Sequence, residues 1–469
     1  MIDLVVQGGK LVLPDACHSA DLAVDRGRIV AVGTSATMPK ARRIVDARGH
    51  YVLPGGIDPH VHVRWPFLAA TTADDYASAS MAAAIGGTTT LIDFAHPKMG
   101  STLLERVTNR RAEADGNVAI DYSLHCVMTE GVPESLEQMG VLVEAGVTSF
   151  KLYMAYRRRG IMVDDAALFS VMRHASKLGA LVCVHAENGT IADAHEAQFV
   201  AQGRVKAADF PRHKPNYVEA EAIQRAIFWA RQTGARLYIF HLSSADGLSL
   251  VREAQEQGVR VIAETCPQYL LLDESVYDRP VDGHCFICSP PIRSASDKEA
   301  LWEGIAQGVI TVIGTDHCAF TLEQKNIGQN DFTQVPNGLP GLETRISLLH
   351  TEGVVKGRIS VNQLAAITSL NPAHTFGIFP RKGILAPDSD ADIVVFDPAR
   401  EWALSPKELH MNVDWSPYAG WKLQGAPVTT ISRGEVIVDG GEFVGTSGRG
   451  RFMQRAHDTS RVASFEGSF

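Results

Sequence analysis

The sequence contains no run of 18 or more apolar residues, the length that a helix needs in order to cross a membrane. Its first residues lack the basic segment, apolar stretch and small-residue cleavage site of a secretory signal. Long basic runs are absent too, and 44 Lys and Arg against 53 Asp and Glu give a formal net charge of −9. We therefore expect no membrane partner and no nucleic-acid partner.

Cysteine is scarce and scattered, with seven residues in the chain, an odd number. This usage is typical of a reducing compartment and indicates a cytoplasmic protein without a disulfide framework. Cys285 and Cys288 form a CxxC pair. Because no second pair lies nearby, the pattern favours buried thiols over a structural zinc site.

Along the middle of the chain, strand-like runs alternate with helix-like stretches. The strand-like runs are 51–57, 88–94, 120–128, 149–155, 181–186, 237–243, 259–265 and 310–315. Between them, apolar residues recur at three- and four-residue spacing in stretches such as 73–85, 103–114, 165–178, 219–233, 248–257 and 297–307. Eight strands alternating with helices predict an α/β fold, a (β/α)8 barrel of the TIM type.

Short β-like runs lie on both sides of this barrel. Those in residues 1–53 are separated by Gly, Pro and Asp turns and indicate a small antiparallel β unit. Similar hairpin strands return after residue 378. We expect 1–53 and 378–452 to form one β-sandwich domain built from both chain ends, around a barrel at 54–377. The polar tail 453–469 is expected to be extended or poorly ordered.

Residue types that bind metals gather at the C-terminal ends of the predicted strands. His60 and His62 end the first strand and, at i and i+2, point to the same face. His185 and His241 end the fifth and sixth strands, and Asp316 follows the eighth. Functional residues of such a barrel lie at this edge, and neutral imidazole and carboxylate are metal ligands. The pattern therefore predicts a metal centre at the barrel mouth.

Lys151, at the end of the fourth strand, is the unusual member of this set. A lysine ammonium would repel a divalent ion. A neutral lysine amine, in contrast, can take up carbon dioxide and become a carbamate that bridges two metals, and burial favours the neutral form. Two other interpretations are a lysine that reaches solvent and one that forms an ion pair with Asp316.

The chain resembles the cyclic amidohydrolases of the amidohydrolase superfamily, most closely the hydantoinase/dihydropyrimidinase group. The resemblance spans nearly the whole sequence. The matching stretches are PGGIDPHVH, TADDY, AAIGGTTTLIDF, SFKLYMAY, VHAENG, HLSS, ETCPQYLLLD, SPPIR, GTDHCAF and DFTQVPNGLPG.

This resemblance implies a binuclear centre with two Zn²⁺ per subunit, for which Mn²⁺ or Co²⁺ could substitute. One ion would be held by His60, His62 and Asp316. The other would be held by His185 and His241. Carbamylated Lys151 and a hydroxide would bridge the two ions.

The implied reaction is hydrolysis of a ring amide in a small cyclic amide or ureide. Tyr156 would hydrogen-bond the substrate, and backbone groups at Ser289 and Asn337 would bind the amide edge of the ring. Asp316 would accept the hydroxide proton and return it to the leaving nitrogen. A hydantoin would give an N-carbamoyl amino acid and a dihydropyrimidine a ureido acid. The resemblance also implies a homotetramer.

Several residues near the predicted site bear on which substrate is taken. Arg64 stands where dihydroorotases carry an arginine that pairs with a substrate carboxylate, which leaves open an acidic substituent on the substrate. The alternative is a loop arginine that faces solvent or a neighbouring acid. Trp65, Phe67 and Tyr153 are candidate walls for the substituent on the ring, or ordinary packing residues. The arginines at 157–159 are interpreted as a solvated face or subunit contact.

Two kinds of alternative function remain open. An allantoinase or a dihydroorotase is a sister enzyme with related chemistry. A non-catalytic scaffold, like the dihydropyrimidinase-related proteins of neurons, keeps the fold without a complete metal set. Because all the ligand positions are filled in this sequence, the enzyme interpretation is favoured.

Overall fold

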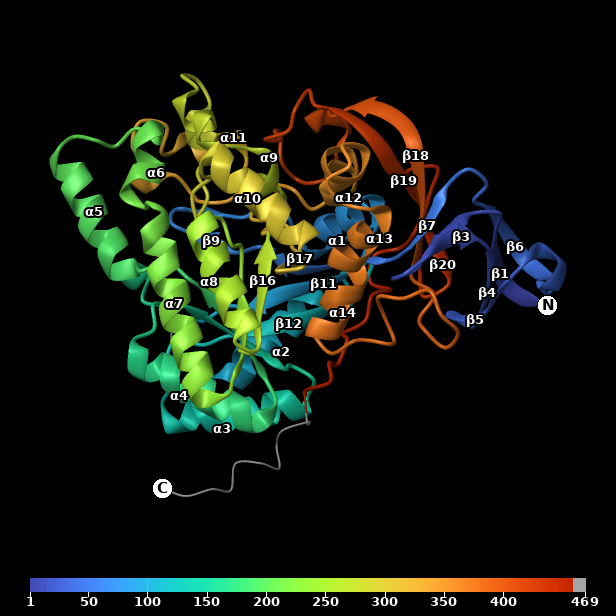
Figure 1. Cartoon of the computed structure of the whole chain (residues 1–469), viewed down its shortest axis with the longest axis horizontal. Helices are drawn as coiled ribbons and strands as arrows, with labels where there is room; N and C mark the ends of the chain where they lie inside the picture. Colours follow the sequence, from blue (N-terminus) through green and yellow to red (C-terminus); the bar gives the residue numbers. More distant parts are fainter. Residues whose placement is uncertain (99, 459–469) are drawn as a thin grey trace.

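A computed structural model describes residues 1–98 and 100–458, and its centre is a barrel of eight parallel strands (Figure 1). The strands follow in chain order around the barrel. They are β8 (Gly56–Val61), β11 (Thr88–Ala95), β12 (Asp121–Val127), β13 (Ser149–Tyr153), β14 (Leu181–His185), β15 (Arg236–Ile239), β16 (Val261–Thr265) and β17 (Ile310–Ile313). A hydrogen bond of 2.8 Å from the His62 N–H to the His317 carbonyl joins the two ends of the sheet. The (β/α)8 prediction is confirmed.

Helices cover the outside of the barrel (Figure 1). Those between successive strands are α1 (Tyr76–Ile85), α2 (Leu103–Ala114), α3 (Pro133–Glu144), α4 (Asp165–Leu178), α7 (Asn216–Thr233), α8 (Ala245–Glu256) and α10 (Ala295–Ala306). The remaining α-helices are α5 (Gly189–Ala201), α6 (Phe210–His213), α9 (Pro267–Leu271), α11 (Leu322–Asn326), α12 (Arg345–Leu349), α13 (Val361–Ala365) and α14 (Asn371–Thr375). Local chemistry sets several starts: the Asp75 carboxylate, for example, caps α1 by accepting from the Ser78 N–H.

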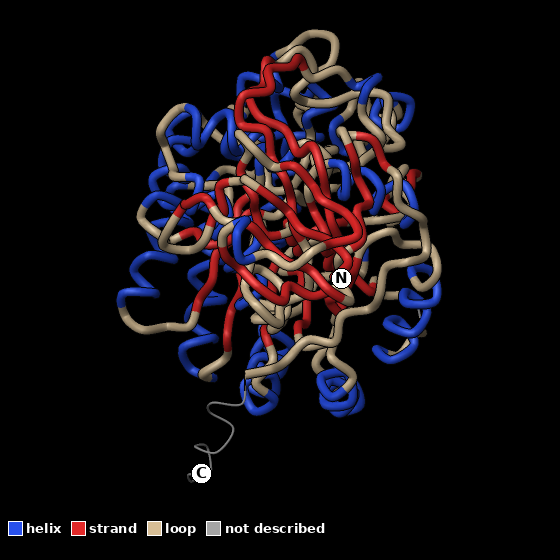
Figure 2. The backbone as a smooth tube through the Cα atoms, turned by 90° about the vertical axis from the view of Figure 1, so that its right-hand side faces the viewer, coloured by secondary structure: helices blue, strands red, loops and turns tan. Residues whose placement is uncertain are grey.

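Both chain ends build a second, all-β part, as predicted (Figure 1), and Figure 2 shows strands of this part facing the viewer around the N-terminus. One sheet is N-terminal and has the order β5 (Arg28–Gly33), β4 (Asp21–Asp25), β1 (Ile2–Gln7), β6 (Ala41–Asp46). The other sheet mixes the ends, in the order β21 (Glu442–Phe443), β20 (Glu435–Asp439), β19 (Lys422–Ser432), β18 (Ile393–Ala403), β7 (Tyr51–Pro54), β2 (Lys10–Val12), β3 (Cys17–Ser19).

Two features of the N-terminal part differ from the prediction. The unit is not purely antiparallel, because β1 pairs with β6 and β2 with β7 in parallel. The connection from β5 to β6 carries the chain to the opposite edge of its sheet, which permits the parallel pairing.

The predicted strand 51–57 is also wrong as a single element. The chain changes sheets at Gly55, whose N–H donates to the Asp392 carbonyl at 2.8 Å, while the next N–H, of Gly56, donates to the Gly87 carbonyl at 2.9 Å. A Cβ on Gly55 would lie 2.2 Å from the Thr89 Oγ1, so only glycine fits this crossing. The residues before it belong to β7 and those after it to β8.

The chain end runs back along the barrel. Met453 and Arg455 are buried, and the Arg455 Nη1 donates to the Ser149 Oγ at 2.8 Å. The described part of the predicted tail, 453–458, is thus packed, while 459–469 lies outside the described residues. Among residues 1–98 and 100–458, every helix is too short or too polar to span a bilayer.

Candidate metal centre and active site

A cavity lies at the C-terminal ends of the barrel strands. It is lined by the residues predicted as ligands, namely His60, His62, Lys151, His185, His241 and Asp316. It is also lined by the predicted substrate contacts Trp65, Phe67, Tyr153, Tyr156, Ser289 and Asn337, together with Cys318 and Gly338. Arg64 is not among the lining residues and its side chain is exposed. The structure therefore brings together every predicted site residue except Arg64.

One half of the centre is built by β8 and the loop after β17. The Nε2 atoms of His60 and His62 lie 3.0 and 3.2 Å from the same oxygen, Oδ1 of Asp316. Burial opposes the ionised form of Asp316, but the two histidines outweigh it and hold the pKa of this carboxyl well below its usual range. Three ligand atoms therefore converge on one point around an ionised carboxylate.

The other half is formed by two imidazole rings that face each other. The Nδ1 of His185 lies 2.9 Å from the Nε2 of His241. Burial lowers the pKa of His185 to about 4 and the pKa of His241 well below its usual value. Both rings are therefore neutral near pH 7, and each neutral ring carries a nitrogen lone pair that can bind a metal.

Lys151 is the middle residue of β13, and its side chain lines the cavity at the barrel mouth. It is 1% exposed, and its Nζ lies 4.0 Å from the ring centre of Phe240 and 4.9 Å from that of Tyr153. Burial among these rings lowers the pKa of the Lys151 amine to about 7. Because a large fraction of the amine is then neutral at neutral pH, the side chain has the form that carbamate chemistry requires.

Three residues that line the cavity have left-handed backbone conformations. The φ angle is 69° at Tyr156, 39° at His241 and 50° at Asp316. Positive φ angles are unfavourable for residues other than glycine. They are common at functional sites, where the surrounding structure holds the strained residues in place.

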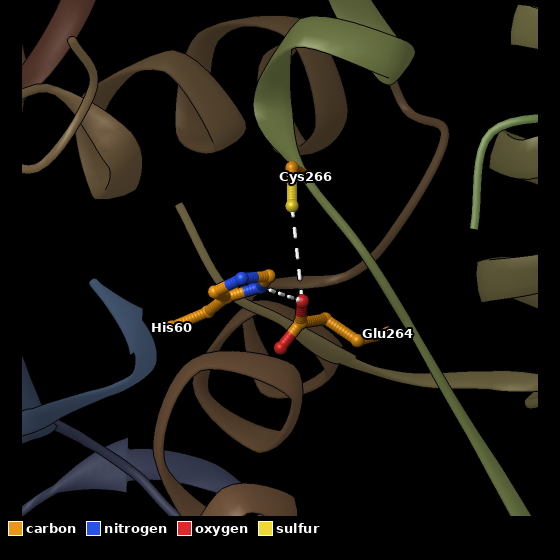
Figure 3. Close-up of side chains that lie close together, drawn as sticks. All are labelled: His60, Glu264 and Cys266. Atoms are coloured by element: carbon orange, nitrogen blue, oxygen red, sulfur yellow. Dashed lines mark hydrogen bonds and ion pairs between the residues drawn. The ribbon is translucent and has the colours of Figure 1, made fainter. Parts of the chain in front are cut away.

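A buried carboxylate, Glu264 of β16, orients the first histidine (Figure 3). Its Oε1 lies 2.6 Å from the Nδ1 of His60, and its Oε2 accepts from the Tyr238 hydroxyl at 2.7 Å. With Nδ1 engaged in this way, the Nε2 of His60 faces Asp316. Burial opposes the charged form of His60, but the carboxylates of Asp316 and Glu264 outweigh it and raise its pKa to about 9.

Cys266, the third residue in this view, contacts the same carboxylate (Figure 3). Its Sγ lies 3.8 Å from the Oε1 of Glu264, close enough for a weak hydrogen bond from the thiol. Burial raises the pKa of Cys266 well above its usual value, so the thiol stays protonated. The Oε1 of Glu264 lies between this thiol and the Nδ1 of His60, so the group of His60, Glu264 and Cys266 supports the first histidine.

The second histidine pair is supported by a chain of polar contacts. The Nε2 of His185 lies 2.7 Å from Glu187, whose carboxylate accepts from the Lys214 ammonium at 2.9 Å. Lys214 also donates to the Ser289 Oγ at 2.9 Å, and the Asn337 Nδ2 donates to the same oxygen at 3.0 Å. This chain fixes the His185 ring and links it to the wall where Ser289 and Asn337 lie.

Sequence reasoning missed Glu264, Glu187 and Lys214. Glu264 is the second-last residue of the seventh strand and could have been found by the same rule that found the histidines. Glu187 follows His185 at i+2, a spacing that already indicates a shared face. Lys214 is distant in sequence from both and carries no comparable signal.

The side chains present fit a binuclear metal centre. Buried carboxylates and imidazoles converge there, and two ring nitrogens, His62 Nδ1 and His241 Nδ1, are buried without a partner among the described residues. A cation between the converging nitrogens and Asp316 would compensate the buried charge. Nitrogen and carboxylate donors suit zinc and related divalent ions.

The barrel and this donor set define the class of protein. The model of the amidohydrolase family matches residues 51–437, and the chain belongs to that family. It is similar to a D-hydantoinase of Ralstonia pickettii, with 40% identity over 97% of this chain and 99% of that one. It is also similar to a D-phenylhydantoinase of Escherichia coli, with 41% identity over 96% and 98%. A crystal structure of dihydropyrimidinase from Brevibacillus agri NCHU1002 superposes with a TM-score of 0.95, at 39% identity over 97% and 98%.

Proposed function

We propose that this protein is a metal-dependent cyclic amidohydrolase that opens 5-substituted hydantoins or dihydropyrimidines by hydrolysis of a ring amide. The observation that carries the proposal is the convergence of four histidines, Lys151 and Asp316 on one cavity that Tyr156, Ser289 and Asn337 also line. The similar D-hydantoinases and dihydropyrimidinase support the substrate class. The products are an N-carbamoyl amino acid or a ureido acid.

The proposed centre holds two Zn²⁺, with Mn²⁺ or Co²⁺ as substitutes. His60, His62 and Asp316 would hold one ion, His185 and His241 would hold the other, and a carbamate on Lys151 would supply oxygen ligands to both. Bound metals lower the pKa of water and polarise a carbonyl oxygen. The burial that lowers the pKa of the Lys151 amine to about 7 supports its carbamylation.

Asp316 is proposed as the group that moves the proton. Its carboxyl is ionised in this setting, and it lies at the mouth beside His60 and His62, so it can accept a proton from the attacking water. The same carboxyl then returns the proton to the ring nitrogen as the amide bond breaks. One side chain therefore serves as base and then as acid.

Tyr156 and the opposite wall position the ring. Burial raises the pKa of the Tyr156 phenol well above its usual value, so the hydroxyl keeps its proton and can donate to a developing oxyanion. Ser289 and Asn337 line the same cavity and are joined by a side-chain hydrogen bond, and their backbone groups are proposed to bind the amide edge of the ring. These contacts fix the carbonyl next to the metal ligands.

A substrate panel on metal-loaded protein tests the proposed function. Hydantoin, 5-phenylhydantoin, dihydrouracil, allantoin and dihydroorotate are compared by kcat/KM. We expect hydantoins or dihydrouracil to be hydrolysed best, since Arg64 is exposed and lines no part of the cavity. Preference for allantoin or dihydroorotate would establish a sister enzyme, and no hydrolysis of any of the five would support a scaffold.

Glu264 offers a test of the supporting contacts. The change Glu264→Gln weakens the hydrogen bond that orients His60 without altering a ligand. Loss of such a partner costs about 10- to 100-fold in metal affinity or activity. We expect a loss of this size in zinc affinity, measured by competition with a chromogenic chelator. Unchanged affinity and activity in a folded Glu264→Gln protein would contradict the positioning role.

We further propose a cytoplasmic homotetramer. All seven cysteines are free thiols, which supports a reducing compartment. Exposed apolar side chains such as Val141, Tyr217 and Phe228 provide surface for subunit contacts. Light scattering should give a mass of about four chains of 50.8 kDa each.

A further inference from the structure

A second cavity, of about 310 Å³, adjoins the catalytic one. The two cavities share Phe67, Tyr156 and Asn337 in their walls. The second cavity is therefore the neighbouring space for the substituent of a ring held against the metal ligands. Its volume is that of a site for a small organic group.

Arg159 differs from the other two arginines of the segment 157–159 in its burial beside this cavity. Arg158 lines the cavity but forms an ion pair with Glu196, and Arg157 is exposed and donates to the Thr190 Oγ1 at 2.8 Å. Arg159 is half-buried and lines the cavity. The interpretation of all three as a solvated face therefore does not hold for Arg159.

The guanidinium of Arg159 lies among aromatic rings. Its centre is 4.1 Å from the ring centre of Phe67, 4.7 Å from that of Trp65 and 5.5 Å from that of Tyr156. Stacking of this kind uses the faces of the planar group and leaves its edges for hydrogen bonds. The rings hold the cation in place beside the shared wall of the two cavities.

The hydrogen-bonding edge of Arg159 is incompletely used. Its Nη2 donates to the Pro66 carbonyl at 3.3 Å, and its Nη1 is buried without a hydrogen-bond partner among the described residues. A buried donor without a partner is unfavourable. A carboxylate satisfies such an edge, because its two oxygens match the geometry of the guanidinium.

We propose that Arg159 selects substrates whose ring substituent carries a carboxylate, such as the hydantoins of acidic amino acids. This inference rests on the proposed function, since it assumes that the ring occupies the catalytic cavity. Arg159 touches the substituent and not the reacting atoms, so it determines specificity. Asp193 and Glu196 also line the second cavity, and the pairing of Glu196 with Arg158 leaves Asp193 as the group that opposes an anion.

The test compares the hydantoin of glutamate with the hydantoin of glutamine, which differ only in carboxylate against carboxamide. We expect the wild-type kcat/KM to favour the acid by about tenfold, the scale of a charge-assisted hydrogen bond over a neutral one. Arg159→Met should lower the acid-to-amide ratio by about tenfold or more, and Arg159→Lys should retain part of it. Arg157→Met, the matched control on the same loop, should leave the ratio unchanged.

Asp193→Asn removes the charge that opposes an anion in the second cavity. This change should therefore raise the acid-to-amide ratio of kcat/KM. No preference for the acid in the wild type, an unchanged ratio in Arg159→Met, or a lowered ratio in Asp193→Asn would each overturn the inference. Hydrolysis of unsubstituted hydantoin distinguishes failure of the Arg159 proposal from failure of the proposed function. If wild type hydrolyses hydantoin without preferring the acid, only the role of Arg159 fails. If it hydrolyses none of the three compounds, the proposed function fails with it.

Discussion

Replacement of Lys151 by alanine should abolish hydantoin hydrolysis and empty the metal centre. The amine is buried inside the barrel mouth, where its carbamate would supply ligands to both ions, and alanine offers no donor. Because metal ions contribute several kcal/mol of charge stabilisation, we expect kcat/KM to fall about a thousandfold or more. Metal content, measured by plasma emission spectrometry, should fall well below that of the wild type.

Rescue and a matched control sharpen this test. A short carboxylic acid such as acetate or propionate, added with zinc, can enter the space left by the side chain and should restore part of the activity of Lys151→Ala. Lys177→Ala, at an exposed lysine of α4, should keep full metal content and activity. Full metal content and activity in Lys151→Ala would eliminate the bridging role.

The change Asp316→Asn should produce the second large loss of catalytic activity. It keeps the shape of the side chain but removes the carboxylate that accepts the proton and lies between His60 and His62. General acid–base catalysis contributes about 10²- to 10⁴-fold, so we expect kcat to fall by at least that range. The measurement is kcat on 5-phenylhydantoin, normalised to the metal bound.

Asp388 provides a control for the backbone. It is exposed and has a φ of 71°, so Asp388→Asn makes the same exchange in the same left-handed region, which asparagine tolerates well. This variant should match the wild type. If Asp316→Asn also stayed within tenfold of the wild type at equal metal content, another group would have to move the proton.

Most of the fold follows from local patterns in the sequence. The buried parallel strands are apolar and β-branched, as in β11, and the helices between them carry amphipathic spacing and caps, so their order was predictable. The break in 51–57 was not, because both halves favour extended backbone. It depends on Asp392 and Gly87, which pair with successive glycines from distant parts of the chain.

The functional site, like the fold, was predictable from the sequence only in part. His60, His185 and His241 were found because they lie at or just after strand ends, which a barrel brings to one edge. Which side chain of an arginine run turns inward is not a local property. Arg159 lies against rings of the loop that follows β8, far from it in sequence, and only the folded chain reveals this.

The most direct test of the proposed function is a metal titration of chelator-stripped protein, followed by hydrolysis of 5-phenylhydantoin. We predict no activity without metal, a rise on addition of zinc, and saturation at about two ions per chain, as a binuclear centre requires. Full activity in protein shown to be free of metal would contradict the account. So would stoichiometric metal binding that has no effect on hydrolysis.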